Sequence, residues 1–158
     1  MACIKDAFAE MGIIIKTIVV NKIFITTFIA WAFAQTLKVI LHFIHHRKLD
    51  FRLFVGTGGM PSSHTAFVSA LATNIGLYCG WDSPIYLVTL AFTVIVITDA
   101  VGVRRAAGKQ ASLLNKMMDE MYEKNEKFPD RLKELLGHTP IEAAAGILLG
   151  ILSAIVMY

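Results

Sequence analysis

Long stretches of apolar residues constrain the fold of this chain more than any other feature of its sequence. Four of them cover about residues 23–44, 64–80, 84–103 and 140–158. A transmembrane helix needs about 20 predominantly apolar residues, so these stretches fit helices that cross a bilayer, although the second is short for a full crossing. Since the composition is 56% hydrophobic and 17% charged, a soluble globular domain is excluded. We expect a single all-α membrane domain, residues 1–158, built as a bundle of about four transmembrane helices.

Residues 7–20 are also apolar, but this segment carries Glu10 and Lys16. It therefore fits either an interfacial amphipathic helix or an extension of the first transmembrane helix. A cleaved signal peptide is not expected, because Asp6 and Glu10 are acidic and no small-residue cleavage site follows a compact apolar core.

Basic residues are concentrated in two connections, which four membrane crossings would place on the same side of the bilayer. Arg47, Lys48 and Arg52 lie in the first connection, and eight lysines and arginines lie between residues 104 and 133 in the second. The positive-inside rule places both connections in the cytoplasm. We expect a multi-pass protein of the cell membrane with lipid as a partner and no nucleic-acid partner. Polar residues in its helices could be buried against a second copy in a homo-oligomer.

The second connection, about residues 104–138, is the only long polar segment. Apolar residues recur within it at helical spacing and predict an amphipathic cytoplasmic helix. These residues are Leu113, Leu114, Met117, Met118 and Met121. We interpret the methionines as packing residues, not as part of a cofactor site.

A polar motif, Gly-Gly-Met-Pro-Ser-Ser-His at residues 58–64, stands where the second apolar stretch begins. Pro61 suits the entry of a helix, whose free backbone N–H groups form an anion site. Ser62 or Ser63 could cap this helix or donate to an anion, and His64 is a candidate proton donor or acceptor. The alternative is a well-capped helix whose histidine faces the lipid headgroups.

The last apolar stretch follows a second motif, Gly-His-Thr-Pro-Ile-Glu at residues 137–142. Thr139 and Glu142 have the spacing of a capping box, which by itself would explain the glutamate. His138 and Glu142 are four residues apart, so the first helical turn could also bring the carboxylate to the imidazole. A carboxylate in this position fixes the tautomer of a nucleophilic or general-base histidine.

Charged and polar residues in the other two stretches are further candidates. Asp99 lies near the end of the third stretch, and Arg104 and Arg105 follow it. Arginine suits phosphate oxygens, although these two could instead anchor the helix at lipid headgroups. Gln35 and Lys38 share one face of the first stretch and should face the bundle interior. Lys38 could neutralise a bound phosphate or reach the membrane interface.

Together these motifs resemble those of the type 2 phosphatidic acid phosphatase and vanadium haloperoxidase superfamily. Pro-Ser-Ser-His at residues 61–64 is similar to the Pro-Ser-Gly-His motif of that superfamily. Ala-Gln-x-x-Lys ending at Lys38, Asp-Ala-Val-Gly-Val-Arg-Arg at residues 99–105 and the motif at residues 137–142 complete the resemblance. It covers nearly the whole chain and is closest to the divergent membrane branch of the superfamily.

The resemblance implies a metal-independent phosphatase that needs no cofactor and cleaves a lipid phosphomonoester through a phosphohistidine. His138 would be the nucleophile, Glu142 its orienting carboxylate and His64 the general acid. The implied phosphate ligands are Lys38, Ser62, Ser63, Arg104 and Arg105, supported by Gln35 and Asp99. Three departures from the superfamily pattern are the serine at position 63, the lack of a clear Lys-x6-Arg-Pro motif around Lys38 and the long segment that separates Arg105 from His138.

Two other classes of function remain open. A small transporter or lipid-binding protein would use the polar residues inside the bundle, Gln35, Lys38 and Asp99. A metal-dependent hydrolase would instead bring the two candidate histidines together with Asp99 and Glu142, because nitrogen and oxygen ligands suit several divalent ions.

Overall fold

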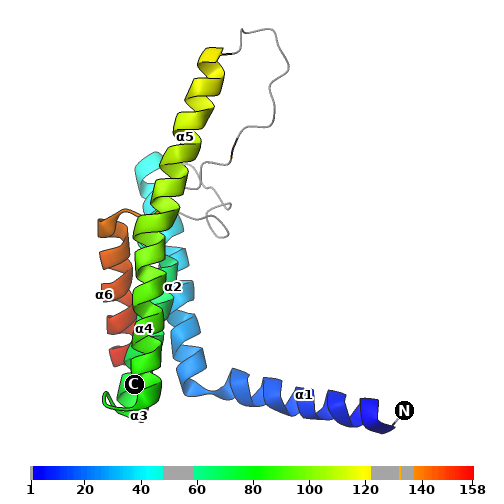
Figure 1. Ribbon diagram of the computed structural model, residues 1–158. Coiled ribbons are helices and arrows are strands. Elements are labelled where there is room, and N and C mark those ends of the chain that lie inside the picture. The colour runs from blue at the N-terminus through cyan, green and yellow to red at the C-terminus, as the bar shows by residue number, and fades with distance from the viewer. Residues whose placement is uncertain (1, 48–58, 122–131, 133–136) are drawn as a thin grey trace.

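The computed structural model describes residues 2–47, 59–121, 132 and 137–158, and all regular structure within them is helical (Figure 1). Its elements are α1 (Ala2–Val20), α2 (Lys22–His46), α3 (Ser63–Cys79), α4 (Pro84–Thr98), the π-helical segment η2 (Asp99–Val103), α5 (Arg104–Met121) and α6 (Pro140–Met157). The predicted all-α bundle is therefore confirmed. Lys48, Arg52, Gly58 and most of the connection between α5 and α6 lie outside the described residues.

Three stretches of the described chain are long and apolar enough to cross a membrane: Lys22–His45, Pro84–Glu120 and Pro140–Met157. Many of their large apolar side chains point away from the bundle; Val156 of α6, for example, is 83% exposed. Apolar surface on this scale is typical of helices that face lipid. The fourth predicted crossing, α3, has 17 residues and packs among α2, α4 and α6 (Figure 1).

The central helix of the bundle is α3, which packs against α2, α4 and α6. Hydrogen bonds join it to α4 and α2, as well as to α6. Thr93 Oγ1 of α4 donates to the Val68 carbonyl oxygen at 3.2 Å, and Asn74 Nδ2 donates to Thr27 Oγ1 of α2 at 3.3 Å. Polar contacts of this kind hold helices together where the surrounding lipid is as apolar as the side chains.

The closest helix pair is α3 and α6, because glycines of α6 face the backbone of α3. A Cβ atom on Gly146 would overlap Thr65 Oγ1 and the Ser62 carbonyl oxygen, and one on Gly150 would overlap the Ala66 carbonyl oxygen. Gly146 and Gly150 are four residues apart, the spacing with which small residues let two membrane helices approach. This contact fixes the start of α3 against the start of α6.

At the opposite end of the bundle, short connections join the helices. Asn21 caps α2 by accepting the backbone N–H groups of Ile23 and Phe24, and α1 leaves the bundle at a wide angle (Figure 1). Of the two options for residues 7–20, the extension of the first transmembrane helix is therefore wrong. Ser83 caps α4 directly before Pro84, at the end of the short connection from α3.

One continuous helix runs from α4 through η2 into α5 (Figure 1). The helix predicted from the spacing of Leu113 and its apolar neighbours is present as α5. It is not separated from the third apolar stretch, because η2 changes the helical hydrogen-bond spacing without ending the helix. The C-terminal end of α2, the N-terminal ends of α3 and α6, and η2 all lie at one end of the bundle.

Candidate active site

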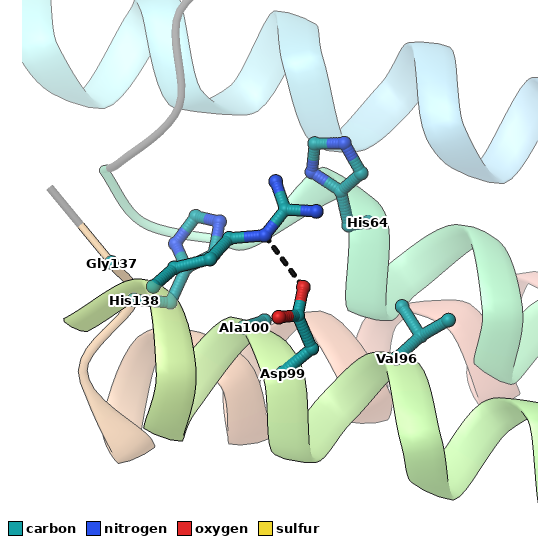
Figure 2. A pocket seen from close by; sticks show the side chains of 7 residues that line it. His64, Val96, Asp99, Ala100, Gly137 and His138 are labelled. Carbon is teal, nitrogen blue, oxygen red and sulfur yellow. Dashed lines mark hydrogen bonds and ion pairs between the residues drawn. The ribbon is translucent and has the colours of Figure 1, made fainter. Parts of the chain in front are cut away.

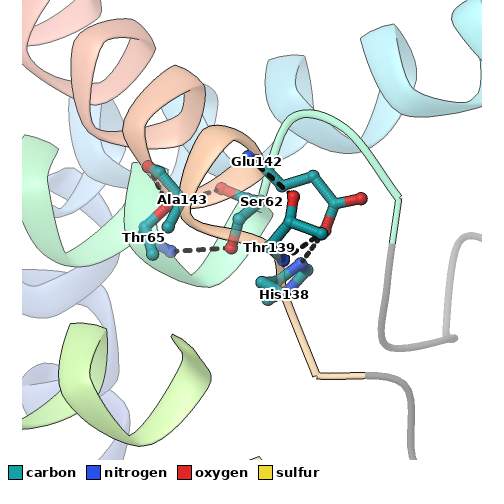
Figure 3. Close-up of polar contacts among 6 residues, drawn as sticks. All are labelled: Ser62, Thr65, His138, Thr139, Glu142 and Ala143. Atoms are coloured by element: carbon teal, nitrogen blue, oxygen red, sulfur yellow. Dashed lines mark hydrogen bonds and ion pairs between the residues drawn. The ribbon is translucent and has the colours of Figure 1, made fainter. Parts of the chain in front are cut away.

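His138 is oriented by Glu142 on the first turn of α6 (Figure 3). Glu142 Oε2 lies 3.3 Å from His138 Nδ1 and accepts the backbone N–H of Thr139 at 3.0 Å. Thr139 Oγ1 accepts the Glu142 N–H in turn, which completes the predicted capping box. The glutamate therefore serves as helix cap and orienting carboxylate at once. Because an ionised carboxylate can only accept, Nδ1 of the neutral ring carries the proton and Nε2 keeps its lone pair.

The backbone of His138 is fixed against the π-helical segment. Its N–H donates to the Ala100 carbonyl oxygen at 3.1 Å. The preceding Gly137 packs on the backbone of Arg105 so closely that a Cβ atom at position 137 would overlap it. These contacts bring His138 to the end of α4 although more than thirty residues separate the two in the sequence. The His138 side chain is buried there, with 4% of the residue exposed.

Arg104 is positioned by the unusual geometry of η2. The backbone N–H of Arg104 donates to the carbonyl oxygen of Asp99, five residues earlier, as in a π-helix. The side chains of the same two residues also meet, with Arg104 Nε 2.6 Å from Asp99 Oδ2 (Figure 2). In an α-helix the side chains that face each other are three or four residues apart. The π-helical turn therefore creates this ion pair. Because Arg104 uses its Nε atom for Asp99, its terminal guanidinium nitrogens are available to an anion.

The start of α3 is tied to the start of α6 (Figure 3). The Ser62 N–H donates to the Glu142 carbonyl oxygen, and Thr65 Oγ1 donates to the Ala143 carbonyl oxygen, both at 3.1 Å. His64 lies on the exposed side of the first turn of α3, with its ring centroid 6.5 Å from that of His138. The two histidines, which come from separate sequence motifs, therefore lie side by side.

A pocket of about 310 Å³, including space open to solvent, lies between these groups. Figure 2 shows His64 and His138 on either side of the ion pair that Asp99 forms. The lining residues are His64, Val96, Asp99, Ala100, Arg104, Gly137 and His138. Two imidazoles and a guanidinium converge here, while the one carboxylate is engaged by the arginine. This charge distribution suits a phosphoryl group.

Lys38 reaches this end of the bundle from α2, on the other side of Glu142. Its side chain is 2% exposed and lines a neighbouring pocket that also contains Glu142. Gly59, which has a φ of 85°, lies against it; a Cβ atom there would approach Lys38 Cγ to 3.2 Å. Gln35, one turn earlier on α2, is 5% exposed. Both side chains face the bundle interior as expected, and the binding of phosphate by Lys38 stays a prediction.

Besides Lys38, three predicted phosphate ligands do not line the pocket between the histidines. The Ser62 hydroxyl accepts the Thr65 N–H at 3.4 Å as the N-cap of α3, and Ser63 is 1% exposed. Arg105 supplies the backbone surface on which Gly137 packs. Of the two neighbouring arginines, the structure brings only Arg104 to the pocket.

The sequence reasoning missed the part of the site that η2 provides. The Ala100 carbonyl that holds His138 is a backbone group, and no residue type at positions 99–103 marks a π-helical turn. The close contact of α6 with α3 did carry a signal, the Gly-x-x-x-Gly spacing of Gly146 and Gly150.

Burial lowers the pKa of the His138 imidazole below its ordinary value, because an apolar environment disfavours the charged ring. The hydrogen bond and the negative charge of Glu142 act in the opposite direction, and the charges of Lys38 and Arg104 lower the pKa further. The ring is therefore neutral near pH 7, which leaves the Nε2 lone pair free to attack an electrophile.

The convergence of ligands that a metal-dependent hydrolase would need is not found. Across residues 2–47, 59–121, 132 and 137–158, no three His, Cys, Asp or Glu side chains form a group that could hold a metal ion. His64 and His138 are neighbours, but Asp99 is paired with Arg104, and Glu142 is engaged by its capping box.

Comparison with known proteins agrees with the arrangement of these motifs. No solved structure matches the chain. The chain is 46% identical over 136 residues to "Uncharacterized membrane protein YuiD" of Bacillus subtilis (strain 168), an alignment that covers 79% of this chain and 86% of that protein. Residues 19–153, which include the whole candidate site, match the sequence profile of the Divergent PAP2 family. The chain is therefore a membrane protein that belongs to the Divergent PAP2 family, the PAP2-related branch that its motifs resemble.

Proposed function

We propose that this protein is a membrane phosphatase that hydrolyses a lipid phosphomonoester through a phosphohistidine intermediate. The observation that carries the proposal is the position of His138. Its Nδ1 is held by Glu142, and its ring lies 6.5 Å, between centroids, from that of His64. At this separation each imidazole can come within about 3–3.5 Å of a reacting atom placed between them.

In the first step, His138 Nε2 attacks phosphorus and the bond from phosphorus to the ester oxygen breaks. The leaving oxygen takes a proton from the His64 imidazolium and departs as the alcohol. The phosphoryl group is then covalently bound to His138, while Glu142 stabilises the positive charge that develops on the ring. Arg104, held by Asp99, stabilises the equatorial phosphoryl oxygens, where charge is concentrated in phosphoryl transfer.

In the second step, neutral His64 accepts a proton from water as the water oxygen attacks phosphorus. The bond between phosphorus and nitrogen breaks, His138 returns to its neutral form and inorganic phosphate leaves. The net reaction consumes one water and yields an alcohol and phosphate. Each histidine ends in the protonation state in which it began, so the cycle can repeat.

The site lies at one end of a bundle of membrane-spanning helices, which favours a substrate with a phosphate headgroup and an apolar body. The basic residues of this end, among them Arg47 and Arg104, favour its placement at the cytoplasmic face of the cell membrane by the positive-inside rule. Lys38, buried beside Glu142, places a basic side chain close to the reacting groups.

Release of inorganic phosphate tests the proposal. Purified protein in detergent is incubated with a panel of lipid phosphomonoesters in the presence of a chelator, and wild type is compared with His138→Ala and His64→Ala. We expect release by wild type and loss of release in both variants, with unchanged elution in size-exclusion chromatography as the control for folding. Full activity in both variants would remove the proposal. Activity that a chelator abolishes and one metal restores would favour the metal-dependent class.

A further inference from the structure

A second and larger pocket opens between α2, α3 and α4, with about 830 Å³ of space including the part open to its surroundings. Four aromatic side chains line it: Phe28 and Trp31 of α2, Phe67 of α3 and Phe92 of α4. We call this pocket the aromatic groove. The rings of Phe28 and Trp31 pack with their centroids 5.2 Å apart. Phe28 is 50% exposed and Phe92 51%, so both keep a ring surface for a ligand.

The aromatic groove adjoins the pocket between the histidines, because three residues line both. These are His64, Val96 and Arg104. Figure 2 shows Val96 and His138 at opposite ends of this group, with His64 and Asp99 between them. A ligand that extends from His138 past Val96 therefore passes from a cationic site into an apolar one.

Because the two pockets adjoin, we infer that the aromatic groove binds the hydrocarbon chain of the substrate while its phosphate lies between the histidines. The inference rests on the proposed function. A ligand that fills both pockets must be anionic beside Arg104 and apolar beside the four aromatic rings, and a phosphorylated lipid joins the two properties in one molecule. Since α2 and α4 belong to stretches that can span a membrane, the chain enters sideways from the bilayer.

The length of the chain is then part of substrate recognition. Alkyl phosphates from propyl to decyl phosphate are assayed as monomers, in one detergent at one concentration, and kcat/KM is measured for each. Each methylene that becomes buried in the groove should raise kcat/KM by roughly fourfold until the groove is filled. A series in which kcat/KM does not depend on chain length would overturn the inference and leave the phosphatase proposal standing.

Longer alkyl phosphates also partition more strongly into the detergent micelle, and this contribution to the chain-length effect is the same for all variants. Substitution of the aromatic side chains therefore isolates the contribution of the groove. In Phe28→Ala combined with Phe92→Ala, the ratio of kcat/KM for decyl phosphate over propyl phosphate should fall by about tenfold. The matched control is Phe33→Ala, since Phe33 is also on α2 and 56% exposed but lines none of the pockets of the site. An equal ratio in both variants would contradict a chain site in the groove.

A binding measurement keeps the inference testable if no substrate is hydrolysed. A photoreactive alkyl phosphate is bound to the His138→Ala variant, and the labelled residues are mapped by mass spectrometry. We expect labels on α2 and α4 near Phe28 and Phe92, and decyl phosphate should compete with this labelling. If wild type hydrolyses no substrate, this result would support the binding site for the chain and contradict the proposal that the protein is a phosphatase. Labels spread over all outer faces of the bundle would show that the ligand is only dissolved in the surrounding detergent. A wild-type dimer that Phe28→Ala and Phe92→Ala convert to a monomer would assign the groove to a second copy. Either result overturns the inference.

Discussion

The contact of Gly146 with the start of α3 predicts that one added methyl group damages both stability and catalysis. In Gly146→Ala the new Cβ would overlap Thr65 Oγ1 and the Ser62 carbonyl oxygen, far inside the ordinary contact distance of ~3.5 Å. Because one of the two atoms belongs to the backbone, rotation of a side chain cannot relieve the overlap. The helices α3 and α6 must therefore move apart by about 1 Å.

The size of the effect follows from a matched control. Gly12→Ala adds the same methyl group to α1, where a Cβ atom would have no other heavy atom within 4 Å. Both variants gain the higher helix propensity of alanine, so the difference between them isolates the overlap at Gly146. Overpacking of this kind costs about 1–3 kcal/mol. At 2–4 °C per kcal/mol for a chain of this size, Gly146→Ala should unfold roughly 2–12 °C below Gly12→Ala.

The same displacement moves His64 relative to His138, because His64 lies at the start of α3 and His138 is held at the start of α6. A misplacement of about 1 Å can reduce the rate about 100-fold. Thermal unfolding in detergent and phosphate release are measured on both glycine variants. If Gly146→Ala is as stable as Gly12→Ala and keeps the activity of wild type, the close α3–α6 contact does not position the site as described.

Four further predictions concern the reacting groups. The pH profile of kcat/KM should be bell-shaped, because the mechanism needs a neutral His138 and a protonated His64. Its acid limb should have a midpoint below about 6.5, because burial favours the neutral nucleophile; a profile from pH 4 to 8 gives the midpoint, and an acid limb above 6.5 would contradict it. Glu142→Gln should lower kcat between about 10²- and 10⁴-fold, because an amide can donate to Nδ1 and stabilise the wrong tautomer. Its control is Thr139→Ala, which removes only the side-chain cap and should cost about 1 kcal/mol of stability and little activity. Steady-state kinetics and thermal unfolding are measured on both variants. Arg104→Ala should lower kcat about 10²- to 10³-fold by removing stabilisation of the phosphoryl oxygens. Asp99→Asn should lower kcat less than Arg104→Ala does, because the arginine remains but is less well held; an equal loss in steady-state kinetics would show that Asp99 has a role of its own.

The features that depend on local sequence could be predicted from it. The apolar stretches gave the helices, since a chain in lipid must satisfy its backbone groups within each helix. The spacing of Thr139 and Glu142 predicted the capping box, and the four-residue spacing of His138 and Glu142 predicted the contact of carboxylate and imidazole. All of these contacts lie within one helical turn, where the sequence separation determines the distance.

The features that depend on tertiary packing could not be predicted. The ion pair of Asp99 and Arg104 requires a π-helical turn, which the residue types at those positions do not specify. The approach of His138 to Arg104 depends on a hydrogen bond to the Ala100 carbonyl. The placement of Arg104 in the pocket follows from the π-helical turn, which pairs its side chain with Asp99. These details require the three-dimensional arrangement of α4, η2 and α6.

Detection of the covalent intermediate tests the central claim most directly. Wild-type protein is mixed with a lipid phosphomonoester in the presence of a chelator and quenched with alkali, which preserves a bond between phosphorus and nitrogen, and the phosphorylated residue is identified by mass spectrometry. We predict a phosphoryl group on His138 and none in His138→Ala. Phosphate release by wild type with no phosphoryl group on His138 at any time during turnover would contradict the account.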